Sequence, residues 1–246
     1  MKKQLIFYFL SIFVFLVLGF VTSYIVINYE MSIQLVFIIL NLPHVGQLAF
    51  NLIAFKQYEL VNFKAKYIYW AAIITLSVVL VSTLIDIPNI SIIKTSAISK
   101  IAMCLIVFII TPLQAANEEF AFRIIPSIYL KKFTAPVMST IFALMHIGNP
   151  EGIGENQLVF FLYFFLFSYL SFALCLKLNN FAPAIVMHSI VNIFAFAFVS
   201  YRGIVRQTDS FFVTSTEASA VAAIIQLLSI FLLLFLVIWR NEKKIK

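Results

Sequence analysis

The residues that could carry out chemistry in this sequence begin with two adjacent carboxylates, Glu118 and Glu119, followed by Arg123. They come directly after an apolar run, Ala97 to Ala116, that is long enough to cross most of a bilayer. An ionisable group at such depth costs about 2.5–3.5 kcal/mol or more, so it usually marks a functional site. On a helix Glu119 and Arg123 are one turn apart and can pair, whereas Glu118 points about 100° away. One carboxylate can therefore be held as an ion while the other acts as a general base. A purely structural ion pair is the alternative.

Three further polar side chains, His146, His188 and Asn192, interrupt apolar runs later in the chain. His188 and Asn192 are four residues apart, so on a helix both can face one reacting centre. Taken singly, each histidine could equally be hydrogen-bonded to a neighbouring helix without any catalytic role. His44 follows Pro43 and has no matching partner pattern, and we interpret it as structural.

The composition indicates the class of protein. Of the 246 residues, 63% are hydrophobic and 11% are charged, and the mean hydropathy is +1.05. Soluble domains are about 45–50% apolar and about 25% charged, so we predict an all-α polytopic membrane protein. We expect one integral-membrane domain over residues 1–246, with the motifs confined to about 100–195. The two cysteines, Cys104 and Cys175, are isolated in apolar runs, which indicates neither a disulfide nor a CxxC site.

The apolar runs predict about eight transmembrane helices, each near the roughly 20 residues needed to cross the hydrocarbon core. The fourth is expected to continue past Pro112 and to contain both adjacent glutamates. The predicted spans are Leu5–Ile27, Ser32–Phe55, Tyr67–Asp86, Ala97–Leu130, Thr134–Gly148, Gln157–Leu176, Phe181–Ser200 and Ala218–Trp239.

The distribution of lysine and arginine predicts the orientation of these spans. If both termini are cytoplasmic, 12 of the 17 basic residues lie inside, 4 lie outside and Arg123 lies within the membrane. This asymmetry follows the positive-inside rule, so we predict a multi-pass protein of the cell membrane with both termini in the cytoplasm. A separate ninth span at Glu118–Leu130 would move every later loop to the opposite side of the membrane, and the distribution of basic residues argues against it. The net charge of +7 is explained by lipid headgroups and orientation, so the lipid bilayer is an expected partner and nucleic acid is not.

The expected depths of the polar side chains agree with one another. We counted about 1.5 Å per helical residue from the nearest basic residue at the cytoplasmic end of each span. This count puts Glu118, His146 and Asn192 about 20–22 Å deep and His188 about 16 Å deep. Three helices that are far apart in the sequence are therefore expected to present acid, imidazole and amide groups at one level.

A family resemblance rests on three motifs that occur in a fixed order within about residues 100–195. The motifs are Glu118-Glu119-x-x-x-Arg123, Phe142-x-x-x-His146 and His188-x-x-x-Asn192. Their order resembles that of the CPBP family, which includes the CAAX prenyl endopeptidases and bacterial proteins linked to bacteriocin processing and self-immunity. Each motif alone is weak, but the three together inside eight spans are fairly specific. One departure is Ile124, where relatives commonly have glycine after the arginine.

The resemblance implies an intramembrane endopeptidase in which Glu118 and His146 activate water, while His188 and Asn192 hold the oxyanion. Peptide hydrolysis needs an activated water, a proton shuttle and donors for the oxyanion, and these residue types can supply all three. Glu118, His146 and His188 could instead ligate a divalent metal such as zinc, with one position open for water. Otherwise no cofactor is expected. The absence of HExxH excludes the zincin motif, and no serine or cysteine lies in a recognisable nucleophile motif.

Three classes of function remain open at this point. The leading interpretation is an endopeptidase that acts on a peptide or membrane-protein substrate, in bacteriocin processing or self-immunity. The second is a non-catalytic membrane protein of the same fold that confers immunity by binding a peptide or partner. A proton-coupled transporter is less favoured, because transporters usually have repeated halves with broken helices and no such internal symmetry is visible.

Overall fold

The computed structural model describes residues 2–55, 61–63, 66–85, 87–129, 134–147, 157–200, 210–214 and 220–243. The longer helices are α1 (Lys2–Asn28), α2 (Ile33–Phe55), α3 (Lys66–Ile85), α4 (Ala97–Glu119), α6 (Thr134–His146), α7 (Gln157–Leu178), α8 (Ala182–Ile193) and α9 (Ala220–Lys243). The shorter elements are the 3-10 helix η2 (Ile87–Asn89), the π-helices η3 (Phe120–Ile124) and η6 (Phe194–Phe198), helix α5 (Ile125–Tyr129), and strands β1 (Ile90–Ile92), β2 (Val199–Ser200) and β3 (Phe212–Thr214).

The helices have the length and surface of membrane spans. In the described part of the chain, five helical segments are long and apolar enough to cross a membrane, and three shorter apolar helices accompany them. Large apolar side chains cover the outside, and on α1 Phe20 is 75% exposed and Ile27 76%. So much exposed apolar surface belongs against lipid rather than water. The expected all-α polytopic membrane protein is confirmed.

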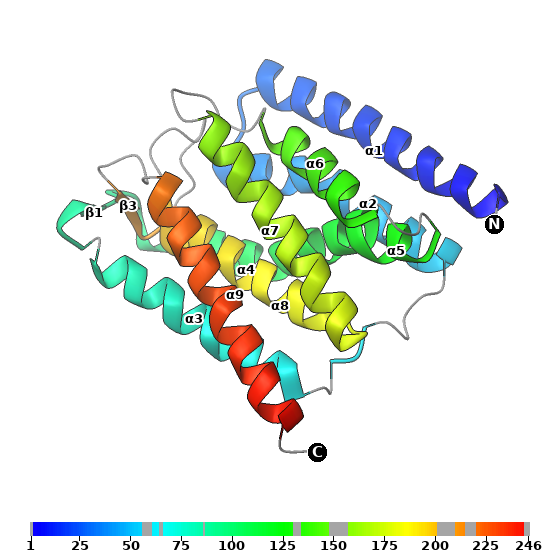
Figure 1. Ribbon diagram of the computed structural model, residues 1–246. Coiled ribbons are helices and arrows are strands. Elements are labelled where there is room, and N and C mark those ends of the chain that lie inside the picture. The colour runs from blue at the N-terminus through cyan, green and yellow to red at the C-terminus, as the bar shows by residue number, and fades with distance from the viewer. Residues whose placement is uncertain are drawn as a thin grey trace.

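Helices α4 and α8 lie at the centre of the bundle (Figure 1). Helix α4 packs against α2 and α8, and α8 also packs against α3. Helix α1 covers α2, α6 pairs with α7, and α9 packs across α3 and α7. The two central helices contain most of the polar residues that the sequence singles out, so these residues are removed from lipid.

The predicted spans agree with the observed helices, except at some ends. Asp86, Leu130, Gly148 and Ala218, which are expected helix ends, lie outside the described residues. The expectation that the seventh span stays helical to Ser200 is wrong, because the helix ends at Phe198 and residues 199–200 form β2. A run of phenylalanine, alanine and valine is apolar at either period, so the pattern cannot separate strand from helix there.

A small sheet that the sequence did not predict joins two connections at one end of the bundle. Strand β3 pairs antiparallel with β1 and parallel with β2. The α3–α4 and α8–α9 connections therefore lie on the same side. Asn62 and Asn180 join the α2–α3 and α7–α8 connections, with the Asn180 side chain bonded to the Asn62 backbone N and O at 3.0 Å each. If eight spans alternate in direction, the two connections of each pair must lie on the same side of the membrane, as they do here.

The fourth span contains a π-helical segment immediately after the paired glutamates. Helices α4, η3 and α5 follow one another without a break from Ala97 to Tyr129, so a separate ninth span is excluded. In η3 the Ile125 amide donates to the Phe120 carbonyl, five residues back. The Ala121 carbonyl would next pair with residue 126, but Pro126 has no amide hydrogen. The Tyr8 hydroxyl of α1 donates to that carbonyl instead, at 2.9 Å.

Candidate active site

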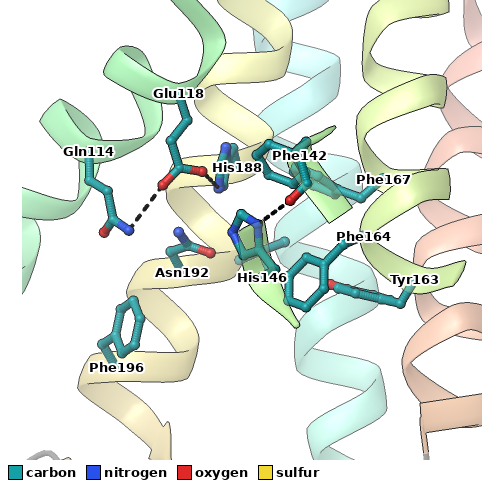
Figure 2. Close-up of a pocket in the computed structure, with 11 residues that line it drawn as sticks. Gln114, Glu118, Phe142, His146, Tyr163, Phe164, Phe167, His188, Asn192 and Phe196 are labelled. Atoms are coloured by element: carbon teal, nitrogen blue, oxygen red, sulfur yellow. Dashed lines mark hydrogen bonds and ion pairs between the residues drawn. The ribbon is translucent and has the colours of Figure 1, made fainter. Parts of the chain in front are cut away.

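A cavity of about 80 Å³ opens between the central helices and α6 and α7. Its volume has room for several water molecules. The side chains that line it are Gln114, Glu118, Phe142, His146, Tyr163, Phe164, Phe167, His188, Val191, Asn192 and Phe196. Figure 2 shows the polar members from three helices pointing into the same space. The four residues expected to take part in the reaction therefore do meet, whereas Glu119 and Arg123 lie behind the cavity wall.

Glu118 is the carboxylate that faces the cavity. It is 4% exposed, and its Oε1 accepts a hydrogen bond from Gln114 Nε2 at 3.2 Å. Its Oε2 lies 3.6 Å from His188 Nε2, beyond hydrogen-bonding distance, and accepts no hydrogen bond from the described residues. Gln114 was not predicted as a site residue, although its position one turn before Glu118 on the same helix face is a usable signal.

Glu119 has the opposite surroundings. Its Oε1 lies 2.5 Å from Arg123 Nη1, and both side chains are fully buried. The guanidinium lies 4.9 Å from the centre of the Phe142 ring and 5.6 Å from that of Phe167. Its Nε donates to the Ser168 carbonyl at 3.4 Å. The geometry agrees with the predicted pairing of Glu119 with Arg123, and Arg123 does not line the cavity.

His188 lies between the two glutamates. Its Nδ1 is 3.2 Å from Glu119 Oε1, and because a carboxylate only accepts, Nδ1 carries the proton of that bond. Its Nε2 faces Glu118 and the cavity (Figure 2). The ring also packs edge-on against Phe167 at 4.9 Å. The sequence paired Glu119 only with Arg123, so this second contact was missed. It joins helices that are distant in the chain, and helix periodicity reports only neighbours within one helix.

His146 and Asn192 complete the polar lining. The Nδ1 of His146 donates to the Phe142 carbonyl at 2.7 Å, one turn back on α6. Its ring stacks on Phe164 with centroids 4.3 Å apart. These contacts fix the ring plane and leave Nε2 as the acceptor in neutral imidazole. Asn192 lies one turn after His188 on α8 and presents its amide to the same cavity (Figure 2).

His44 lies close to polar side chains of α4, which the sequence did not predict. We interpreted it as structural, but its Nδ1 lies 3.9 Å from Glu118 Oε1 and 3.3 Å from Asn117 Nδ2. The side chain is 17% exposed and does not line the cavity. It reaches Glu118 because α2 packs along α4. The sequence of one helix does not show which neighbouring helix each of its faces will contact.

Ile124, the departure from the family pattern, is fully buried at the end of η3. It packs in a small apolar cluster with Leu48, Phe120, Cys175, Phe181 and Ala184. The larger side chain is accommodated by packing, and every polar position of the motifs stays in place.

The donor set does not fit a metal centre. Within the described residues, no three histidine, cysteine, aspartate or glutamate side chains converge as metal ligands would. The expected ligands Glu118, His146 and His188 share the cavity without forming such a group. The Nδ1 bonds of His146 to a carbonyl and of His188 to Glu119 are also common in metal-bound histidines, so the conclusion rests on the missing three-ligand group alone. We derive no step of the reaction through a metal.

The region that contains the cavity is similar in sequence to a known family. Residues 97–194 match the family described as type II CAAX prenyl endopeptidase Rce1-like. No curated protein matches the chain. The matched region contains all three motifs and every cavity-lining residue except Phe196, while His44 lies outside it. Over residues 97–194, the chain therefore contains an Rce1-like domain of the CPBP (CAAX protease) family, a family of intramembrane endopeptidases.

Proposed function

We propose that this protein hydrolyses a peptide bond inside the membrane, with a water molecule activated by Glu118 and His146. The observation that supports this most directly is the cavity, in which one carboxylate, two imidazoles and two carboxamides face a common space large enough for water. A carboxylate oxygen without a hydrogen-bond donor among the described residues, Glu118 Oε2, is suited to accept a proton.

In the proposed reaction, water lies between Glu118 and His146 and gives one proton to Glu118 as its oxygen attacks the peptide carbonyl carbon. The oxyanion that forms accepts hydrogen bonds from Asn192 Nδ2 and from Nε2–H of His188 in its imidazolium form. Collapse of the tetrahedral intermediate breaks the C–N bond. The proton held by Glu118 then passes to the leaving nitrogen, so water is consumed and no covalent enzyme intermediate forms.

The matched family name indicates the substrate class to test first, a prenylated peptide with a C-terminal CAAX sequence. The cavity volume is below the roughly 300 Å³ of typical ligand pockets, so a peptide must separate the lining side chains to enter. A role in bacteriocin processing or self-immunity is the cellular context that we propose from the motif resemblance.

The test compares membranes from cells that express the wild-type protein, Glu118→Gln or Glu30→Gln. Glu30 is exposed after the end of α1, so its variant makes the same chemical change away from the cavity. We expect uncleaved substrate to accumulate only with Glu118→Gln, at equal protein levels, as seen by quantitative proteomics of membrane peptides. A non-catalytic immunity or binding protein predicts no such accumulation, together with full protection of cells by Glu118→Gln.

A further inference from the structure

The side chains that line the cavity are not equally buried. Glu118, Phe142, Phe167 and His188 are each at most 4% exposed. The other lining side chains are half-buried, and they are Gln114, His146, Tyr163, Phe164, Val191, Asn192 and Phe196. Figure 2 shows the four buried side chains in the upper part of the view, with Asn192, Tyr163 and Phe196 below them. The cavity therefore has a closed end and an end whose walls can be reached from outside.

The half-buried side chains lie toward the end of the bundle that contains the small sheet. His146 is the last residue of α6, and Phe196 lies in η6, directly before β2. Helix α7 runs antiparallel to α8, to which a short turn joins it, so its start at Gln157 lies at the same end (Figure 1). At 1.5 Å per residue, Tyr163 is about 9 Å from that start and about 22 Å from the other end of α7, Leu178. The open end of the cavity therefore faces the sheet.

The opposite end of the cavity is closed by groups that are held together. Arg123, one helical turn beyond Glu119, is fully buried. Its guanidinium lies 4.9 Å from the centre of the Phe142 ring and 5.6 Å from that of Phe167. Its Nε donates to the Ser168 carbonyl at 3.4 Å. A peptide that entered from this end would separate the buried ion pair and leave both charges without compensation. At the sheet end it would displace only half-buried side chains.

We infer that the substrate enters the cavity from the sheet end, past Tyr163 and Phe196. This inference rests on the proposed function. The distribution of basic residues predicts that the sheet end faces the exterior, so the substrate is a peptide that reaches the protein from outside the cytoplasm. The half-buried Tyr163, Phe164 and Phe196 are aromatic, so the entrance suits a segment with apolar side chains. A protein held at the cytoplasmic face would meet the closed end first.

Single cysteines test where water reaches the cavity, in a protein with Cys104 and Cys175 replaced. Tyr163→Cys places a thiol in the cavity wall, whereas Leu162→Cys places one at nearly the same depth on α7, at a site that is 41% exposed on the outside of the bundle. The thiolate is the reactive form, and a thiol in apolar surroundings stays protonated. We therefore expect a small membrane-impermeant thiosulfonate, added to intact cells, to label Tyr163→Cys at least about 10-fold faster than Leu162→Cys.

Three further positions serve as controls. Ser168→Cys, a small change at a fully buried site, should stay unlabelled until the protein is denatured. Ile92→Cys marks the sheet end and Phe63→Cys the opposite end of the bundle. If Tyr163→Cys does not fold, Phe196→Cys on η6 replaces it. Labelling of the cavity cysteine only after the cells are opened, or no faster than that of the lipid-facing control, would overturn the inference.

Labelling needs no cleavage, so this inference and the proposed function can fail separately. Glu118→Gln should leave the labelling of Tyr163→Cys unchanged while it removes cleavage. After labelling from outside, purified Tyr163→Cys should lose cleavage relative to the same variant left unlabelled, because the added group fills the entrance to a cavity of only about 80 Å³. Undiminished cleavage after complete labelling would mean that the substrate uses another route. Full activity of Glu118→Gln would instead reject the proposed function.

Discussion

Glu118 and Glu119 are adjacent in the sequence, yet their side chains have different jobs because successive helical residues point in different directions. Glu119 is bonded to Arg123 and to His188, whereas Glu118 faces the cavity with one oxygen that accepts no hydrogen bond from the described residues. The division was predictable from the i, i+4 spacing of Glu119 and Arg123. What helix periodicity could not supply was the contact of Glu119 with His188, which depends on how α4 and α8 pack.

The buried pair gives the first prediction. Removing one partner of a buried ion pair typically costs 3–5 kcal/mol because the other charge is left without compensation. Arg123→Ala should therefore lower the free energy of unfolding by about 3–5 kcal/mol, which is seen as a lower thermal stability. Activity should fall as well. Arg123→Lys should be intermediate, since it keeps the charge but loses the planar guanidinium between Phe142 and Phe167. Arg240→Ala, at an exposed site on α9, is the control. Normal stability of Arg123→Ala with no activity would instead indicate direct contact with substrate.

The donor geometry gives a second prediction, on metal removal. The reaction proposed here uses only protein groups and water, and the described histidines and glutamates include no three-ligand group. We expect the initial cleavage rate to stay within about 2-fold of the untreated rate after chelation, with less than one metal ion per ten protein molecules by elemental analysis. A rate that falls on chelation and returns with one divalent ion would show that a metal takes part.

At the scale of the elements, the two π-helical segments in the described residues lie just after site residues. Segment η3 follows Glu118 and Glu119, and η6 follows shortly after Asn192. A π-helical turn widens the helix and is frequently found at functional sites. The sequence could predict a continuous fourth span, but not this local widening, because the hydroxyl that donates to the displaced Ala121 carbonyl comes from α1. That donor is Tyr8.

Tyr8 therefore gives a third prediction. Tyr8→Phe would leave the Ala121 carbonyl buried without its donor, which costs about 1–3 kcal/mol. We expect a lower unfolding temperature, measured by differential scanning fluorimetry in detergent. The control is Tyr24→Phe on the same helix, whose side chain is 59% exposed, and it should be neutral. Equal unfolding temperatures for the two variants would mean that η3 is stable without the bond from α1.

At the scale of the whole molecule, the order of spans was predictable and the small sheet was not. Runs of about 20 apolar residues and the asymmetry of basic residues were sufficient for eight spans. The three short strands are too brief and too apolar to differ from helical sequence, and they exist only because two distant connections meet. That meeting supports the predicted alternation of loops, since both connections lie on the side that the charge distribution assigns to the exterior.

The orientation gives a fourth prediction. Phe63 in the α2–α3 connection and Ile92 in the α3–α4 connection are both well exposed, at 59% and 70%. Single cysteines at these positions, in a protein with Cys104 and Cys175 replaced, should react with a membrane-impermeant maleimide on opposite faces of intact cells. Ile92→Cys should label from outside, and Phe63→Cys only after the cells are opened. Labelling of both from the same face would be incompatible with eight alternating spans.

The central claim is that Glu118 and His146 together activate one water molecule. The most direct measurement is the initial rate of peptide cleavage by purified wild type, Glu118→Gln, His146→Ala and the double variant. Each single change should lower the rate about 10²–10⁴-fold, because general-base contributions have that size. If the two residues act as one unit, their rate losses do not multiply. The double variant should therefore be less than about 10-fold slower than the slower of the two single variants. A wild-type rate in Glu118→Gln, or losses that multiply in the double variant, would contradict the mechanism.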